Sequence, residues 1–167
     1  MNNKRLRQYV GIVVAVAAYY LVHEGAHLIT ALLQGTFKAV HFMGVGMQID
    51  IHRQMATDGQ LFVFCIMGAV ATFVASVALV LLLNKICKAK SAMLRAVMYY
   101  ITIAFLFLDP LYLSVLCGFF GGGDMNGIAL LVPELWARVA FGVLFVLNLW
   151  VFVKVVLPAY TESFKQQ

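Results

Sequence analysis

The chain has 167 residues, of which 63% are hydrophobic and 11% are charged, with a formal net charge of +5. Soluble domains contain roughly 45–50% apolar and about 25% charged residues, so the charges here are too few to cover a soluble surface. The composition therefore excludes a soluble globular protein and predicts an all-α polytopic membrane protein. The length allows one domain, residues 1–167, with about four spans of roughly 20 residues each.

The first apolar stretch follows a basic N-terminus and runs from Tyr9 to Leu33. It is longer than the apolar part of a signal peptide, which is roughly 7–15 residues. We therefore interpret it as a retained transmembrane helix over about residues 10–33.

This first span contains the sequence His-Glu-Gly-Ala-His, which begins at His23. On a helix, positions i and i+4 share one face, so His23 and His27 can bind the same metal ion. Glu24 lies about 100° further round the helix, where its carboxylate can act as a base toward water at that ion. A chance helix with hydrogen-bonded histidines is the alternative, but ionisable groups are costly in hydrocarbon. The motif predicts a catalytic site with one Zn²⁺ per chain.

The segment 36–53 has a different periodicity. Apolar residues recur there at every second position: Val40 and Phe42, then Met47, Ile49 and Ile51. This period is typical of strands, and Gly44 and Gly46 flank the expected turn, so we predict a β-hairpin at the membrane. An open strand edge cannot face lipid, so the hairpin should line a wet cavity or be shielded by protein. Its edge, at Val40, Phe42, Gly44 and Gly46, is a candidate for binding substrate by strand addition.

Three further spans are expected, over about residues 61–83, 92–117 and 136–157. A polar linker, Met55 to Gln60, precedes the first of them. Asp109-Pro110 should interrupt the second, because proline removes a donor and disfavours helix at the preceding residue. The glycine-rich stretch before Asp124 should be irregular backbone, followed by a short helix to about Leu131.

Two basic clusters define the expected orientation. They are Lys4, Arg5 and Arg7 before the first span, and Lys85, Lys88, Lys90 and Arg95 after the second. Basic loops remain on the cytoplasmic side, so these clusters indicate topology and not nucleic-acid binding. Both termini are then cytoplasmic, and His23 lies in the outer half of the bilayer.

A catalytic zinc site needs a third protein ligand, and two aspartates are candidates. Asp109 lies at about the depth of His23, although it could instead orient a histidine or bond to backbone groups beside Pro110. Asp124 follows a flexible glycine run that can bring it to the metal, although it could instead be a helix N-cap. The residues alone leave both candidates open.

Other polar groups have simpler interpretations. His41 and His52 have no helical ligand spacing and should be interfacial hairpin residues. The cysteines show no paired spacing and should behave as small apolar residues; they are Cys65, Cys87 and Cys117. Asn126 is a candidate for positioning substrate, whereas Asn148 is better explained as a helix-packing hydrogen bond.

The order of these features resembles the site-2 protease family of intramembrane zinc metalloproteases, in particular its compact bacterial members. The resemblance rests on His-Glu-Gly-Ala-His, the hairpin, a small-residue span and an aspartate between glycines that opens a helix. In this family the third ligand is usually written Leu-Asp-Gly after an irregular stretch, and Gly123-Asp124-Met125-Asn126-Gly127 matches that context. The resemblance therefore favours Asp124 as the ligand, with Asp109 second.

The resemblance implies hydrolysis of transmembrane or membrane-bound protein substrates, in the lipid bilayer of a bacterial plasma membrane. Substrate selection would come from the membrane part itself or from a partner. A homo-oligomer and a regulatory membrane partner are both open as expectations. Two other functions remain open on the sequence. One is a zinc-binding membrane scaffold without proteolysis, and the other is a small ion-transport subunit that uses the motif and Asp109 as an ion path.

Overall fold

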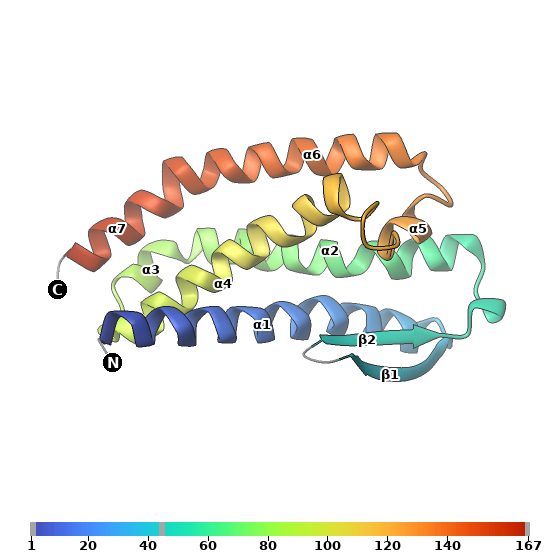
Figure 1. Ribbon diagram of the computed structural model, residues 1–167, viewed down its shortest axis with the longest axis horizontal. Coiled ribbons are helices and arrows are strands. Elements are labelled where there is room, and N and C mark those ends of the chain that lie inside the picture. Colours follow the sequence, from blue (N-terminus) through green and yellow to red (C-terminus); the bar gives the residue numbers. More distant parts are fainter. Residues whose placement is uncertain (1–2, 44–45, 166–167) are drawn as a thin grey trace.

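Long helices packed lengthwise, with a hairpin at one end, make up the computed structural model, which describes residues 3–43 and 46–165 (Figure 1). The α-helices are α1 (Asn3–Leu33), α2 (Asp58–Leu81), α3 (Leu83–Cys87), α4 (Ala92–Leu111), α5 (Asp124–Ile128), α6 (Glu134–Val151) and α7 (Leu157–Lys165). The strands are β1 (Phe37–Met43) and β2 (Gly46–Ile51). A 3₁₀ turn, η1 (Arg53–Met55), and two π-helical turns, η2 (Tyr112–Leu116) and η3 (Phe152–Val156), complete the list.

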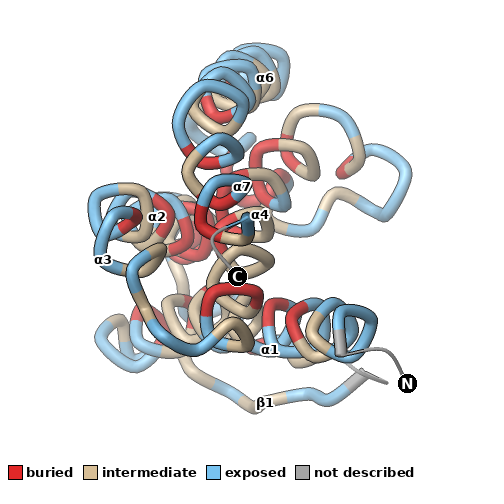
Figure 2. Tube along the Cα trace, turned by 90° about the vertical axis from the view of Figure 1, so that its left-hand side faces the viewer, coloured by how far each residue is buried: buried red, intermediate tan, exposed pale blue. Residues whose placement is uncertain are grey.

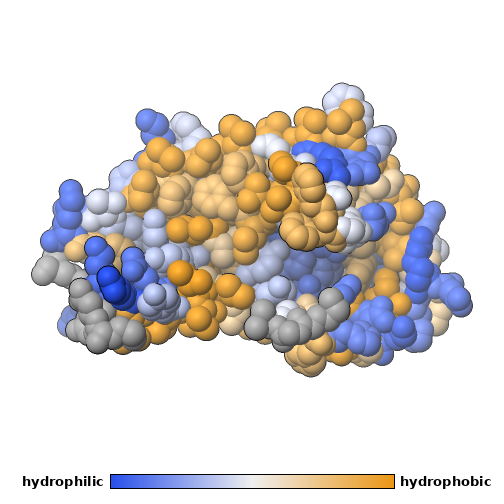
Figure 3. All heavy atoms as spheres, in the orientation of Figure 1, coloured by the Kyte–Doolittle hydropathy of each residue, from blue (hydrophilic) through white to orange (hydrophobic). Residues whose placement is uncertain are grey.

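Four helical runs in the described part of the chain are long and apolar enough to cross a membrane. They are Lys4–Leu33, Asp58–Leu81, Ala92–Leu116 and Glu134–Lys165. Large apolar side chains remain exposed along them, and Figure 3 shows a hydrophobic middle with hydrophilic residues toward both ends. Soluble monomers rarely expose such contiguous apolar surface, so the fold is compatible with a multi-pass membrane protein. The last run continues beyond the predicted end at residue 157, because η3 and α7 extend α6.

The predicted hairpin is confirmed as an antiparallel pair, β1 with β2. Val40 pairs with Ile49, and Phe42 pairs with Met47. Ile49 is buried and packs with Ala31 of α1 and Phe64 of α2, which attaches β2 to the helices. Of the predicted turn residues, Gly44 and Val45 lie outside the described residues.

The polar linker predicted from Met55 to Gln60 is shorter than expected, because α2 already begins at Asp58. Thr57 forms a capping box: its hydroxyl accepts from the backbone N–H of Gln60 at 3.2 Å, and the Gln60 side chain accepts from the Thr57 N–H at 2.9 Å. This reciprocal pair satisfies donors that a helix start leaves open.

The predicted interruption at Asp109-Pro110 is wrong, since α4 continues through Pro110 to Leu111 before the π-helical turn η2. Proline cannot donate to the carbonyl four residues earlier, that of Leu106. The Asn148 amide on α6 donates to this carbonyl at 2.7 Å. The helix therefore persists because another helix supplies the missing donor, which confirms the packing role expected for Asn148.

The helices surround α4, which runs obliquely between α1 and α6 (Figure 1). α1 packs against α2 and α4, α6 covers α4 and η2, and the short α5 lies against α2. The end-on view shows buried residues gathered toward the centre of the bundle (Figure 2). The chain termini and the α3–α4 connection lie at one end, and the hairpin lies toward the other (Figure 1). The histidine motif is therefore on a stretch of α1 that contacts α2, α4 and the hairpin.

Candidate metal centre

His23 and His27 lie on one face of α1, one turn apart, and are 7% and 3% exposed. Their Nε2 atoms are 3.1 Å apart. Gly68 of α2 makes room for this pair, because a Cβ there would lie 2.6 Å from both His23 Cε1 and His27 Nε2. The absence of a side chain at Gly68 therefore sets how closely α2 approaches the imidazoles.

The Nδ1 atom of each histidine faces a hydrogen-bond acceptor. His27 Nδ1 lies 2.7 Å from the Phe64 carbonyl oxygen, which can only accept, so Nδ1 of this ring carries the proton. His23 Nδ1 lies 3.1 Å from the Asp109 carboxylate and is assigned in the same way. In this tautomer each Nε2 has a free lone pair, and both lone pairs face the same cavity. This is how histidine ligands are oriented in metal proteins.

Asp109 is held by hydroxyl donors as well as by His23. The Tyr19 hydroxyl donates to its Oδ1 at 2.6 Å, and the Thr72 hydroxyl donates to its Oδ2. The carboxylate side chain is only 3% exposed. Asp109 therefore reaches the outward nitrogen of His23, not the Nε2 side, which matches the orienting role that was its alternative interpretation.

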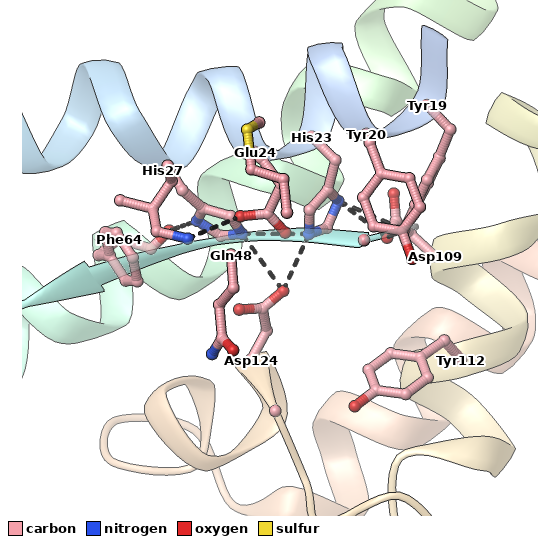
Figure 4. A pocket seen from close by; sticks show the side chains of 14 residues that line it. Tyr19, Tyr20, His23, Glu24, His27, Gln48, Phe64, Asp109, Tyr112 and Asp124 are labelled. Carbon is pink, nitrogen blue, oxygen red and sulfur yellow. Dashed lines mark hydrogen bonds and ion pairs between the residues drawn. The ribbon is translucent and has the colours of Figure 1, made fainter. Parts of the chain in front are cut away.

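Asp124 faces the two Nε2 atoms from the opposite side of the cavity (Figure 4). Its Oδ2 lies 3.2 Å from His23 Nε2 and 3.4 Å from His27 Nε2. It is the first residue of α5, and the N-cap is Gly123, so the alternative of Asp124 as an N-cap is wrong. Gly121, Gly122 and Gly123 have φ angles of +84°, +87° and +46°, a region that favours glycine. The expected irregular glycine run is thus confirmed, and it brings Asp124 to the histidines.

The three facing atoms fit a metal ion. When both Nδ1 atoms carry the single proton of a neutral imidazole, the Nε2 lone pairs of His23 and His27 and a lone pair of the Asp124 carboxylate all face one point, which a cation can occupy. Ligands at roughly 2.0–2.1 Å in a tetrahedron lie about 3.3 Å apart, and the three observed separations are 3.1, 3.2 and 3.4 Å. Two imidazoles and a carboxylate are a donor set that suits Zn²⁺.

Glu24 lines the same cavity from the flank of α1. Its carboxylate accepts from the backbone N–H of Ile49 on β2 at 3.2 Å. A carboxylate oxygen of Glu24 and one nitrogen each of His23 and His27 all lie within 4.8 Å of one another. Glu24 is therefore close enough to exchange a proton with a group bound at the histidines, while the strand fixes its orientation.

The cavity has a volume of about 430 Å³ and is lined by residues of α1, α2, α4, η2, β2 and the start of α5. Besides His23, Glu24, His27, Asp109 and Asp124, its lining includes Tyr19, Tyr20, Gln48, Phe64, Tyr112 and Gly123. Of the predicted hairpin contacts, Gly46 lines the cavity, as do its β2 neighbours Met47 and Ile49. Val40 and Phe42 lie on β1 and are not among the lining residues, and Gly44 lies outside the described residues.

The other polar candidates lie away from the cavity. Asn126 is exposed, and its amide donates to the Gly121 carbonyl at 3.1 Å, so it supports the glycine loop. His41 lies on β1 beside Asp50, whose pKa is lowered by a hydrogen bond from Lys38 at 2.8 Å. His52 is exposed and precedes η1. Neither histidine lines the cavity.

Three tyrosines that line the cavity were not predicted from the sequence: Tyr19, Tyr20 and Tyr112. Tyr19 lies one helical turn before His23, on the helix face that carries both histidines, so the i, i+4 spacing could have predicted that it lines the site. Tyr112 lies in η2, and its ring points toward the cavity from beside Gly123 (Figure 4). Nothing in the sequence signals this contact, because it depends on the π-helical turn after Pro110.

No protein-family model, curated protein or solved structure significantly matches this chain.

Gly68→Ala should weaken zinc binding at least tenfold, because its Cβ would displace both imidazoles. Zinc affinity is measured on purified protein by competition with a coloured chelator. Gly25→Ala is the matched control, because a Cβ at this glycine of α1 meets nothing within 4 Å. Equal affinities for the two variants, both folded by circular dichroism, would contradict the close contact between α2 and the histidines.

Asp124→Asn and Asp109→Asn should differ in severity. Loss of the Asp109 charge removes an orienting partner and should lower zinc affinity roughly 10–100-fold. Asp124 is the candidate third ligand, so loss of its carboxylate should lower the zinc affinity further. The same competition assay compares them, and a larger loss for Asp109→Asn would reverse the assignment of the two aspartates.

Proposed function

We propose that this chain is an integral membrane zinc metalloenzyme. The observation that carries the proposal is the set of three lone-pair atoms of His23, His27 and Asp124, which face one another at metal-ligand separations beside the Glu24 carboxylate. The surrounding helices are apolar enough to cross a membrane, and ionisable groups at such a depth mark functional sites.

The reaction that we propose is peptide-bond hydrolysis of the site-2 protease type. A bound zinc ion supplies activation of water and polarisation of a carbonyl at such a site. Glu24 would take one proton from the attacking water and return it to the amine that leaves, so that one peptide bond and one water yield a carboxylate and an amine. The Ile49 N–H holds the Glu24 carboxylate toward the cavity for both transfers.

The edge of β2 is the proposed substrate-binding element. Opposed residues in an antiparallel ladder alternate between pairs that exchange backbone hydrogen bonds and pairs that do not. The Ile49 N–H donates to Glu24, so it points away from β1, and Val40–Ile49 is a pair without backbone hydrogen bonds. Met47 lies two residues before Ile49, so it belongs to a pair of the same kind, and its backbone N–H and C=O also point away from β1. An extended substrate segment can pair with this edge and place its carbonyl in the cavity beside Glu24.

The proposed orientation has both termini in the cytoplasm of a bacterial plasma membrane. The two basic clusters lie at the end that holds the termini and the α3–α4 connection. At the hairpin end the basic residues pair with acids: Lys38 with Asp50, Arg53 with Asp58, and Arg138 with Glu134. The excess of lysine and arginine at one end favours that end as the cytoplasmic one.

Glu24→Gln should retain zinc and lose proteolysis, because the amide cannot accept the water proton. Quantitative proteomics of membranes from cells with wild-type or Glu24→Gln protein should show a membrane protein that accumulates uncut, with turnover lowered at least 100-fold. His23→Ala should lose both zinc and cleavage.

Met47→Pro removes an N–H from the β2 edge and should impair cleavage without lowering the zinc content.

Each result separates the proposed protease from another function. Unchanged cell proteomes with retained zinc in Glu24→Gln would indicate a non-proteolytic zinc scaffold. An ion path would be indicated instead if the wild-type protein binds no stoichiometric zinc and the Asp109→Asn variant loses ion flux. Normal cleavage by Met47→Pro would exclude strand addition at β2 while leaving the zinc site intact.

The orientation predicts opposite labelling of two exposed sites. In a cysteine-free background, Asp58→Cys should react with a membrane-impermeant maleimide in intact cells, and Lys88→Cys should react only after the membrane is opened. Both positions are exposed: Asp58 is the first residue of α2, and Lys88 directly follows α3. The reverse pattern would place the termini outside.

A further inference from the structure

A second cavity, of about 510 Å³, lies at the end of the bundle opposite the hairpin. Its walls are the first turns of α1, the first half of α4 and the end of α7. We propose that this cavity binds the phosphate-bearing headgroup of an anionic membrane lipid. The inference rests on the proposed membrane insertion but not on proteolysis, because the α1 residues of this cavity lie roughly 22–28 Å along the helix from His23.

The charge of the lining suits a phosphate. Lys4, Arg7 and Lys165 contribute to it, and none of the lining residues that the structure describes is acidic. Hydroxyl and amide groups of the lining, from Tyr99, Tyr100, Thr161 and Gln8, add neutral donors. A phosphodiester offers one negative charge and several acceptor oxygens, which matches a set of cations and neutral donors.

A buried arginine lies behind the wall of this cavity. Arg95 is 7% exposed, and its Nη1 donates to the Ala89 carbonyl. Its Nε and Nη2 have no hydrogen-bond partner among the described residues. The guanidinium lies 5.9 Å from the ring centroid of Phe164, which itself lines the cavity. A buried cation that lacks acceptors raises the affinity of the adjacent space for an anion.

The surface next to the cavity is apolar and can contact acyl chains, which favours a lipid over free phosphate as the ligand. Along α1, the exposed residues that follow Gln8 are apolar: Tyr9, Ile12 and Val13 are 62%, 48% and 68% exposed. Leu94 on α4 is also exposed. A polar cavity that continues into an apolar helix face is the form expected for a headgroup site at the cytoplasmic membrane surface.

The test uses full-length Glu24→Gln protein in neutral detergent, so that the result is independent of cleavage. Native mass spectrometry titrates phosphatidylglycerol and phosphatidylcholine of equal chain length. Phosphatidylglycerol should bind at least tenfold more tightly. Lys4→Gln/Lys165→Gln should lower its affinity about tenfold or more, since each basic residue near an anionic headgroup contributes a factor of roughly five.

The matched control is Lys85→Gln/Lys88→Gln, which removes the same charge from exposed positions at the same end but outside the cavity. It should change the affinity less than twofold. The single variants Lys4→Gln and Lys165→Gln replace the double variant if that protein does not fold. Equal binding of the two lipids, or an equal loss in the control, would overturn the proposal. If millimolar inorganic phosphate displaces bound phosphatidylglycerol from the cavity, free phosphate is the ligand, and this result would also overturn the proposal.

Discussion

The contact between α1 and α2 at Gly68 is the constraint on which the candidate site depends. The backbone of α2 passes so close to His23 and His27 that the Phe64 carbonyl, one turn earlier, reaches His27 Nδ1. The same helix brings Thr72, one turn later, to Asp109. Three consecutive turns of α2 thereby hold one imidazole directly and the other through Asp109. Both rings then direct Nε2 toward one point, which is the condition for shared metal binding.

Irregular backbone supplies the residues that the long helices cannot. A membrane-spanning helix presents groups along its length, so a ligand that approaches from across the cavity must come from another element. Gly121, Gly122 and Gly123 reverse the chain with positive φ angles and leave Asp124 at the start of α5. The hairpin supplies the backbone N–H that orients Glu24.

The apolar runs and the i, i+4 histidines were predictable because each depends only on local spacing. The choice between Asp109 and Asp124 was not predictable in this way. Depth correctly placed Asp109 beside His23, but depth cannot tell which nitrogen of a ring a carboxylate meets. That distinction depends on the α1–α4 packing and on the turn before Asp124. The helix through Pro110 escaped prediction for the same reason, since its missing donor comes from Asn148, on a helix far along the chain.

The charges of the site also explain why a cation would bind there strongly. Asp109 and Asp124 are close to His23, and Glu24 lies on the other flank of the pair. Carboxylates gathered around two neutral imidazoles repel one another, and burial among apolar helices weakens the screening of that repulsion. Without a cation, a histidine must take up a proton or the groups must separate. A divalent ion removes the repulsion without moving the helices, so metal binding and the packing of α1, α2 and α5 stabilise each other.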